Sequence, residues 1–170
     1  MGSILEYILI FFAWTFILYW MHRICHHVPY LKQIHWHHHK FVTGQQPKWM
    51  WQNIFLYSDD WMSTLDIIVT EIIPTIIFCY FTGHWWVFVW YYIWTAFIQE
   101  WFEHNPNFNV WPFSAGKYHL NHHKNWRHNF SLFFPIWDIV FGTHKPVNTC
   151  LLYTSPSPRD RISSRMPSSA

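Results

Sequence analysis

The sequence predicts an all-α integral membrane protein with about three membrane-embedded helices, one span plus a hairpin, and a cytosolic helical cap that carries clusters of histidine. Composition is the first reason. Aromatic residues make up 23% of the chain and charged residues only 12%, about half the usual charged share. A soluble domain needs a charged surface, whereas a membrane protein exposes apolar side chains to lipid and places Trp at the interfaces. The second reason is the presence of 14 histidines in so apolar a chain.

The first membrane segment is predicted at Ile4 to Met21, which is apolar apart from Glu6. Its length is just enough to span a bilayer. A cleaved signal peptide is the alternative, but the segment has no basic region before it and no small-residue cleavage site after it, and a histidine cluster follows at once. We therefore expect a retained spanning helix.

A second apolar block runs from Asp66 to Ile98 and is interrupted at Thr82-Gly83-His84. We interpret it as a helical hairpin, with Ile67–Phe81 as the first arm and Trp85–Ile98 as the return. Basic residues follow the first span and follow the hairpin, whereas the N-terminal end and the hairpin turn carry none. The positive-inside tendency therefore places both polar segments on the cytosolic side of the membrane.

Histidines in three clusters are the candidate metal ligands: His22 and His26; His35, His38 and His39; and His119, His122 and His123. Residues three or four apart share one helical face, so the rings of each cluster point the same way. The predicted topology brings all three clusters to one membrane face. Imidazole is a ligand for Fe, Zn and Cu. Eight such ligands exceed the needs of one tetrahedral ion and indicate two metals, whereas a structural zinc site uses four ligands and favours Cys.

Other polar residues near the clusters are assigned weaker roles. His104 follows the hairpin on the same side and is a candidate ninth ligand. Candidate partners that would orient the ligand rings are Glu100, Asn129 and His128. The remaining histidines are interpreted as ordinary surface or core residues. Carboxylate-bridged di-iron proteins carry Glu-x-x-His pairs, which this sequence lacks. We expect no catalytic residue beyond the metal centre.

The chain divides into a single membrane-embedded domain at residues 1–149 and a tail at residues 150–170. The tail is rich in Ser, Pro and Arg, and Cys150–Asp160 and Ser164–Ala170 resemble translated sequencing adapters, with a disordered terminus as the alternative. Without the tail, eight Lys and Arg balance eight Asp and Glu, which predicts no nucleic-acid partner. Cys25 and Cys79 form no recognisable disulfide framework.

Several ordered motifs connect the clusters. They are Tyr19-Trp20-x-His22-Arg23-x-x-His26-His27, then His122-His123 followed by Asn129-Phe130, and finally Trp137-Asp138-x-x-Phe141-Gly142-Thr143. In residue type and spacing they resemble the sterol desaturase and fatty acid hydroxylase superfamily, over roughly Phe12–Lys145. Ser131 departs from the pattern, because a Gly or Ala usually stands at that position.

The resemblance implies an O2-dependent oxidoreductase of lipid biosynthesis, a hydroxylase, desaturase or methyl oxidase acting on a sterol or fatty acyl substrate. It implies a di-iron centre of two Fe ions with O2 as co-substrate, and a cytochrome b5-type or other NAD(P)H-linked electron donor. Zn2+ binds imidazole more tightly than Fe2+, so the isolated protein can hold zinc. The expected location is the endoplasmic reticulum in a eukaryote or the inner membrane in a bacterium, with the metal site facing the cytosol.

The alternative function is that of a non-enzymatic, histidine-rich membrane protein that binds or transports zinc. Transporters place ionisable ligands inside their membrane spans, whereas the clusters in this chain lie beside the predicted spans. This position favours an enzyme. The sequence leaves open which lipid is oxidised and whether the product is hydroxylated or desaturated.

Overall fold

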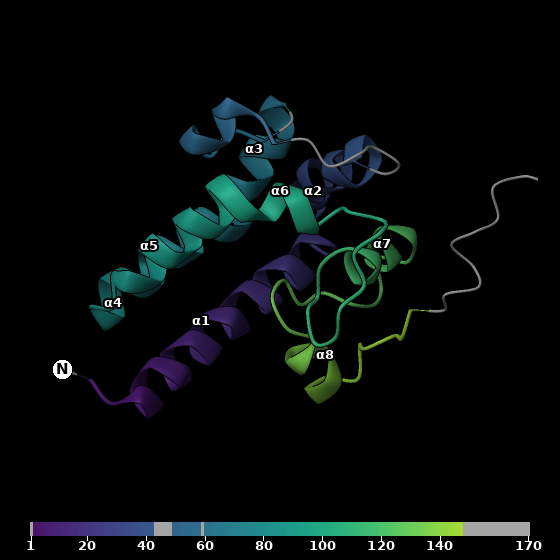
Figure 1. Ribbon diagram of the computed structural model, residues 1–170. Coiled ribbons are helices and arrows are strands. Elements are labelled where there is room, and N and C mark those ends of the chain that lie inside the picture. Colours follow the sequence, from purple (N-terminus) through teal and green to yellow (C-terminus); the bar gives the residue numbers. More distant parts are fainter. Residues whose placement is uncertain (1, 43–48, 59, 148–170) are drawn as a thin grey trace, which may run out of the picture.

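The structure, a computed structural model, describes residues 2–42, 49–58 and 60–147. Within these residues every regular element is helical, which confirms the predicted all-α class. The predicted tail at residues 150–170 lies outside the described residues. The helices form two parts: long helices that lie side by side, and a cap of shorter helices and loops at one end of them (Figure 1).

The first long helix is α1 (Ile4–Cys25). The Ser3 hydroxyl caps its N-terminus by accepting a hydrogen bond from the Glu6 amide at 3.2 Å, which satisfies one of the amides that a helix start leaves unpaired. The helix continues beyond the predicted end at Met21, so His22 lies on its last turn. It is one of two described helices that are long and apolar enough to cross a membrane.

The predicted hairpin is present, but its arms extend further into the cap than the sequence indicated. The first arm combines α3 (Trp61–Ile67), a π-helical turn (Ile68–Ile72) and α4 (Ile73–Thr82). It starts six residues earlier than Ile67 because the Asp60 carboxylate caps it, accepting from the Ser63 amide at 2.8 Å. The arm ends at Gly83, whose φ of 74° suits a residue without a Cβ.

The return arm combines α5 (Trp86–Ile93), a second π-helical turn (Trp94–Ile98) and α6 (Gln99–Phe102). The membrane-length helices in the described residues are α1 and the first arm, Trp61–Thr82. The return arm does not join them, so the number of crossings remains a prediction. The turn of the hairpin lies beside the N-terminal end of α1, where His84 and Glu6 are 3.8 Å apart.

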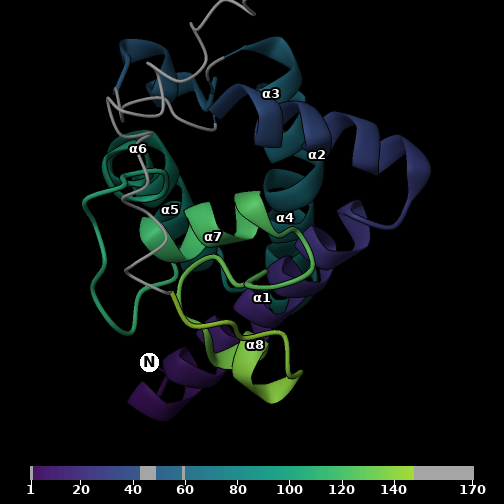
Figure 2. The ribbon, with the colours of Figure 1, turned by 90° about the vertical axis from the view of Figure 1, so that its right-hand side faces the viewer.

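The cap gathers at the opposite end of the long helices. It contains α2 (Pro29–Val42), a 3-10 turn (Trp51–Phe55) and α7 (Lys117–Lys124). The short helix α8 (Ile136–Val140) lies beside the middle of α1, where the Trp137 indole donates to the Thr15 hydroxyl at 3.1 Å. Figure 2 looks toward this end and shows α7 in the middle, with α1, α2 and the hairpin around it. The fold therefore brings the C-terminal end of α1 together with α2 and α7, the three helices that carry the histidine clusters.

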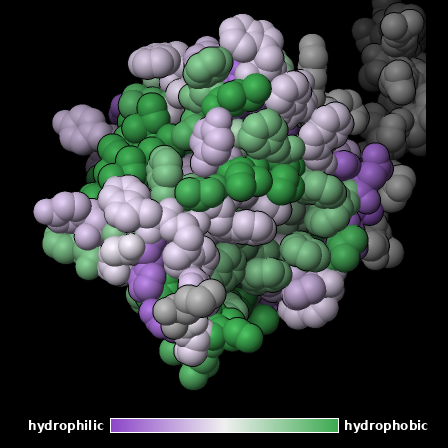
Figure 3. Space-filling view, turned by 60° about the vertical axis from the view of Figure 1, so that its left-hand side comes forward, coloured by the Kyte–Doolittle hydropathy of each residue, from purple (hydrophilic) through white to green (hydrophobic). Residues whose placement is uncertain are grey.

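Aromatic packing joins the long helices, and apolar side chains cover their outside. Trp14 of α1 is fully buried and donates through its indole N–H to the Thr75 hydroxyl at 2.9 Å. On the outer side, Ile77, Phe81 and Val89 are 51%, 80% and 56% exposed, and Figure 3 shows apolar side chains across much of this face. Water would disfavour such a surface, whereas lipid solvates it. The surface agrees with a membrane protein.

Candidate metal centre

All of the predicted histidine ligands meet at the cap end of the molecule. His22 lies on the last turn of α1 and His26 directly follows it; the second cluster lies on α2 and the third on α7. His104, the candidate ninth ligand, follows α6 and joins them. These residues come from segments up to 101 positions apart in the chain, so only the folded cap places their rings together.

The nine imidazoles form two separate groups, each with one nitrogen per ring within 4.8 Å of every other member of its group. Group one is His22, His26, His35, His39 and His122, and group two is His38, His104, His119 and His123. The groups adjoin, because the rings of His39 and His123 stack with centroids 4.2 Å apart. The second and third clusters are each divided between the groups, since neighbouring residues such as His38 and His39 leave a helix in different directions.

Group one contains pairs of ring nitrogens that lie in contact although neither nitrogen carries a hydrogen. His22 donates through Nδ1 to the Phe130 carbonyl at 2.7 Å, and His122 donates through Nδ1 to the His128 carbonyl at 2.7 Å. A carbonyl only accepts, so the hydrogen of each neutral ring is on Nδ1 and its Nε2 carries a lone pair. These two Nε2 atoms are 2.9 Å apart. A cation between them would turn this repulsion into coordination.

The same arrangement recurs at His35, whose Nδ1 is 2.9 Å from the Asp66 carboxylate while its Nε2 is 3.1 Å from Nε2 of His39. A carboxylate that holds one ring nitrogen of a metal-binding histidine fixes the tautomer and increases the basicity of the other nitrogen. Burial lowers the pKa of His35, His39 and His122 below the usual range. The rings are therefore neutral, the form that binds metals.

The loop that supplies the two carbonyl acceptors is held by one buried carboxylate. Asp138 of α8 accepts four hydrogen bonds, from the Phe130 and Ser131 amides and from the Tyr118 and Thr143 hydroxyls, at 2.7–2.9 Å. The bond from the Ser131 amide holds the peptide unit of the Phe130 carbonyl, and the Asn129 amide, in the peptide unit of the His128 carbonyl, donates to the Thr143 carbonyl at 3.0 Å. Asp138 thus positions the acceptor of His22 directly and that of His122 through Thr143, although it touches neither ring.

Group two also has a carboxylate beside it, but this carboxylate lies near two of its rings at a longer distance than Asp66 lies from His35. His119 and His104 each have Nε2 close to Nε2 of His123, at 3.0 and 3.3 Å. The Glu103 carboxylate lies 3.8 Å from Nε2 of His119 and 3.9 Å from Nδ1 of His104. Burial, followed by the negative charge of Glu71, raises the pKa of Glu103 well above its usual range. A cation bound at group two would favour the ionised form.

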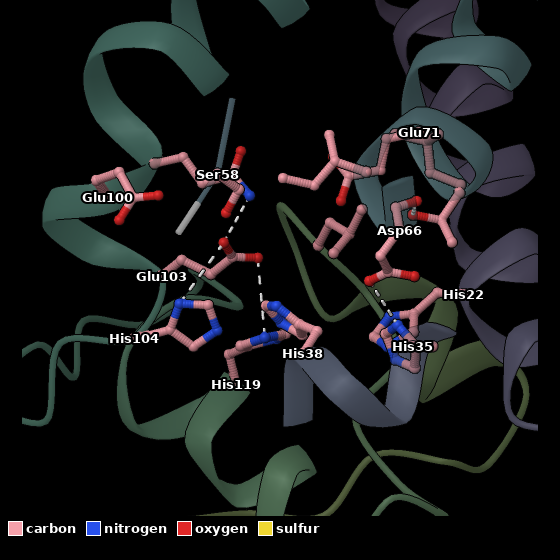
Figure 4. Close-up of a pocket in the computed structure, with 15 residues that line it drawn as sticks. His22, His35, His38, Ser58, Asp66, Glu71, Glu100, Glu103, His104 and His119 are labelled. Carbon is pink, nitrogen blue, oxygen red and sulfur yellow. Dashed lines mark hydrogen bonds and ion pairs between the residues drawn. The ribbon is translucent and has the colours of Figure 1, made fainter. Parts of the chain in front are cut away.

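Between the groups and the hairpin lies a small cavity of about 30 Å³. Figure 4 shows Glu103 pointing at His104 and His119, with Asp66 directed at His35 on the other side. The lining includes histidines of both groups and the apolar side chains of Leu18, Ile67 and Leu132. A space of this size accommodates one or two small molecules such as water or O2. The donor set and the adjacent cavity together fit two imidazole-bound metal ions.

The predicted orienting residues lie near the groups, but they act in different ways. His128 contributes its backbone carbonyl, as described above, and not its ring. Asn129 adopts a positive φ of 61° and bonds the Lys145 backbone through both ends of its amide, which closes the loop rather than contacting a ligand ring. Glu100 lines the cavity and accepts from the Asn53 side chain at 3.3 Å.

Asp66 was not singled out by the sequence as an orienting residue, because it appeared to open an apolar hairpin arm. Asp138 was visible only as part of the Trp-Asp motif. A signal for Asp66 did exist: an acidic residue at the polar end of a membrane arm, on the same side as the histidine clusters, is costly unless it has a partner. Identifying that partner as His35 required the packing of α2 against α3.

The sequence profile of the fatty acid hydroxylase family matches residues 7–143. The chain belongs to the fatty acid hydroxylase family. All nine candidate ligands and Asp138 fall within the matched residues, and the match confirms the resemblance that the ordered motifs indicated.

Curated relatives of the fatty acid hydroxylase chain include enzymes of sterol metabolism. A Delta(7)-sterol 5(6)-desaturase of Aspergillus fumigatus is 28% identical over 86% of this chain and 39% of its own length. Methylsterol monooxygenase 1 of Gallus gallus is 29% identical over 74% of this chain and 41% of its own length. The chain therefore spans about two fifths of the length of these relatives. No solved structure matches the chain.

Proposed function

We propose that this chain forms the core of an O2-dependent lipid oxidoreductase that holds two iron ions, one in each histidine group. The observation that supports the proposal most strongly is the pairing of unprotonated ring nitrogens, such as Nε2 of His22 and of His122 at 2.9 Å. Buried lone pairs in contact are unfavourable unless a cation lies between them. Neutral imidazoles with fixed tautomers are suitable ligands for Fe2+.

The side chains around the groups hold and protect the proposed centre. Asp66 and the loop carbonyls at Phe130 and His128 keep ring hydrogens on Nδ1, so that the opposite nitrogens stay available. An iron pair bound there would activate O2 for attack on an unactivated C–H bond. The small cavity limits water beside the centre, and Glu103 and Gln99, joined at 2.5 Å, line it on the hairpin side.

The proposed substrate is a membrane lipid, a sterol or a fatty acyl chain. The apolar exterior of α4 and α5 supports a position in lipid, and the cavity lies where α1 meets both hairpin arms. The two relatives described above act on sterols by name, which makes sterols the first substrates to screen. Electrons would come from a cytochrome b5-type or other NAD(P)H-linked donor. The proposed location is the endoplasmic reticulum or a bacterial inner membrane, with the centre facing the cytosol.

The proposal is tested by metal content and iron spectroscopy on the chain expressed in membranes with iron supplied. Wild type should bind about two irons per chain, the number of histidine groups, and give an O2-sensitive signal. His122→Ala removes a ligand of group one and His38→Ala removes a ligand of group two, so each should lose mainly one of the two irons. His84→Ala, at the hairpin turn beside Glu6, is the matched control and should keep both.

The outcomes separate this proposal from zinc binding or transport. Two irons that disappear with the two ligand variants, together with oxidation of an added lipid, support the oxygenase. A chain that takes up only zinc when both metals are offered, with no O2-sensitive signal, supports zinc storage or transport instead. Metal that remains bound after both ligand substitutions would reject the site itself.

A further inference from the structure

We propose that the surface formed by Lys32, Trp126 and Arg127 is the docking and electron-entry site for an acidic one-electron donor protein. We call these three residues the Trp126 surface. The proposal rests on the proposed function, because it assigns a partner to the same metal centre. Trp126 has cations on its outer side and a ligand ring on its inner side.

The outer side of Trp126 is basic. The ammonium of Lys32, on α2, lies 5.1 Å from the centroid of the indole ring, and the guanidinium of Arg127 lies 5.3 Å from it. Both cations are exposed, whereas the indole is half-buried. Cations at this distance over an aromatic face are held by its quadrupole. Two solvent-exposed positive charges are therefore held next to a partly exposed aromatic ring.

The inner side of Trp126 contacts group one directly. Its indole stacks on the imidazole of His26 with centroids 5.6 Å apart and an interplanar angle of 20°. Nε2 of His26 in turn lies 3.1 Å from Nε2 of His122. His26 belongs to group one, so a donor that touches Trp126 is separated from a metal held there by two stacked rings, those of Trp126 and His26. Electron transfer weakens steeply with distance, so this contact is a favourable point of entry.

The distribution of charge defines the partner. The described acidic side chains are placed away from Trp126. Asp138 is fully buried, Asp60 bonds His37, and Glu6 lies at the far end of α1. The other four line the cavity: Asp66, Glu71, Glu100 and Glu103. The basic residues near Trp126 face solvent and include Lys124 as well. The domain is close to neutral by sequence, yet its cap presents positive charge around Trp126. Complementary charge speeds encounter and orients a partner, so the surface fits an acidic protein.

The transfer step is simple to balance. If group one holds iron, the reduced donor would give up one electron and become oxidised, and one Fe3+ would become Fe2+, with no bond formed and no proton required. Trp126 is in this scheme the contact through which the electron passes, and Lys32 and Arg127 hold the donor in position.

Docking is tested with the soluble haem domain of cytochrome b5, an acidic one-electron protein, as the probe. The double variant Lys32→Glu/Arg127→Glu should weaken its binding to the full chain by at least about tenfold at low salt, and high salt should remove the difference. The single variants Lys32→Glu and Lys40→Glu make the same charge change on α2, about 12 Å apart along the helix, and Lys40→Glu should have a much smaller effect than Lys32→Glu. Equal binding by the double variant and wild type would overturn the proposal.

Electron entry is tested separately, by the rate of haem oxidation at saturating donor on the iron-loaded chain. Trp126→Leu should lower this rate at saturating donor by about tenfold or more, with a smaller loss of donor affinity than the double variant because Lys32 and Arg127 remain. Trp126→Phe keeps an aromatic ring against His26 and should retain most of the rate. Iron content is measured in each variant; if Trp126→Leu has lost iron, Trp126→Met takes its place as the non-aromatic variant, and if Trp126→Phe has lost iron, Trp126→Tyr takes its place as the aromatic one. An unchanged rate in Trp126→Leu with full iron would overturn the entry route.

Two further measurements distinguish a lost docking surface from a failed metal centre and from lipid binding. Reduction by dithionite does not need a docking surface, so its rate should be equal in all iron-loaded variants. If wild type fails to bind iron, or fails to react with O2 after reduction by dithionite, the proposed function is rejected and not the docking surface. Vesicles with anionic lipid test the other possible occupant. If the double variant loses vesicle binding but keeps its affinity for the haem domain, the surface binds lipid headgroups and the proposal is wrong.

Discussion

The two histidine groups are adjacent, but they are held by different means. Group one is fully buried, and three of its rings have Nδ1 fixed by backbone carbonyls or by Asp66. Group two contains the half-buried rings of His104 and His123 and has the carboxylate of Glu103 next to it. A rigid set of neutral ligands favours tight, permanent binding. A set with a carboxylate and a cavity beside it leaves space for a ligand that exchanges.

The comparison assigns different tasks to the groups within the proposed centre. Group one adjoins Trp126 and is positioned to receive electrons, whereas group two adjoins more of the cavity, through His38, His104 and His119. The structural reason lies in α2 and α7, because each helix sends rings to both groups. Movement of either helix would therefore disturb both groups, but changes in the supporting residues should affect one group at a time.

The largest effect is expected for Asp138→Ala, which would break the support of group one. The substitution leaves two amides and two hydroxyls without their charged acceptor and should reduce the free energy of unfolding by on the order of 4 kcal/mol. Thermal unfolding in detergent measures the loss. Asp138→Asn keeps the shape and one oxygen and should lie between wild type and the Ala variant. Equal stability of all three would show that the loop is held by other contacts.

Asp66→Ala should act on group one alone. It removes the carboxylate that fixes His35 and should weaken one metal site by about 10–100-fold, the usual cost of losing such a partner. Chelator competition with stepwise metal release measures each site. Asp60→Ala is the matched control, because Asp60 bonds His37, which belongs to neither group. Equal weakening of both sites by Asp66→Ala would contradict independent support of the groups.

Glu103→Gln should act on group two. Loss of the negative charge beside His104 and His119 should weaken that site by about tenfold, at the lower end of the range for such partners, while group one keeps its affinity. The same chelator titration provides the measurement. Glu100→Gln changes another carboxyl of the cavity lining and should have less effect, because the Glu100 carboxylate accepts a hydrogen bond from the Asn53 side chain whereas Glu103 lies beside two ligand rings. A reversed order of the two variants would assign the carboxylate role to Glu100.

The smallest effect is expected for Ser131→Ala. The Ser131 hydroxyl accepts a hydrogen bond from the Asp138 amide at 3.3 Å, a long bond whose loss should cost about 0.5–1 kcal/mol of stability. Metal binding by group one should be nearly unchanged, because the Ser131 amide still donates to Asp138. Thermal unfolding provides the test. A clear loss of iron would mean that the hydroxyl positions the loop more than its geometry indicates.

Much of the site was predictable because spacing along a helix is a local property. His22 and His26, like His119 and His123, are one helical turn apart, so their shared direction follows from the sequence. The hairpin was also predictable from its apolar arms and Gly83, but its arms were underestimated. Asp60 and Ser63 are polar, and the sequence alone did not show that a capped polar turn continues the first arm into the cap.

The sequence by itself determined the helical class, the family motifs and the set of nine candidate ligands, because periodicity, the length of apolar segments and the order of motifs depend only on the order of residues in the chain. Only the tertiary structure decided how those ligands divide into two groups, that Asp66 holds His35, and that Asp138 fixes the loop behind His22 and His122. Several of these contacts join residues far apart in the chain, 31 positions for His35 and Asp66 and 108 for His22 and Phe130. Their geometry depends on how α1, α2, α7 and the hairpin pack, and such packing follows from the combined burial of many side chains rather than from any single motif.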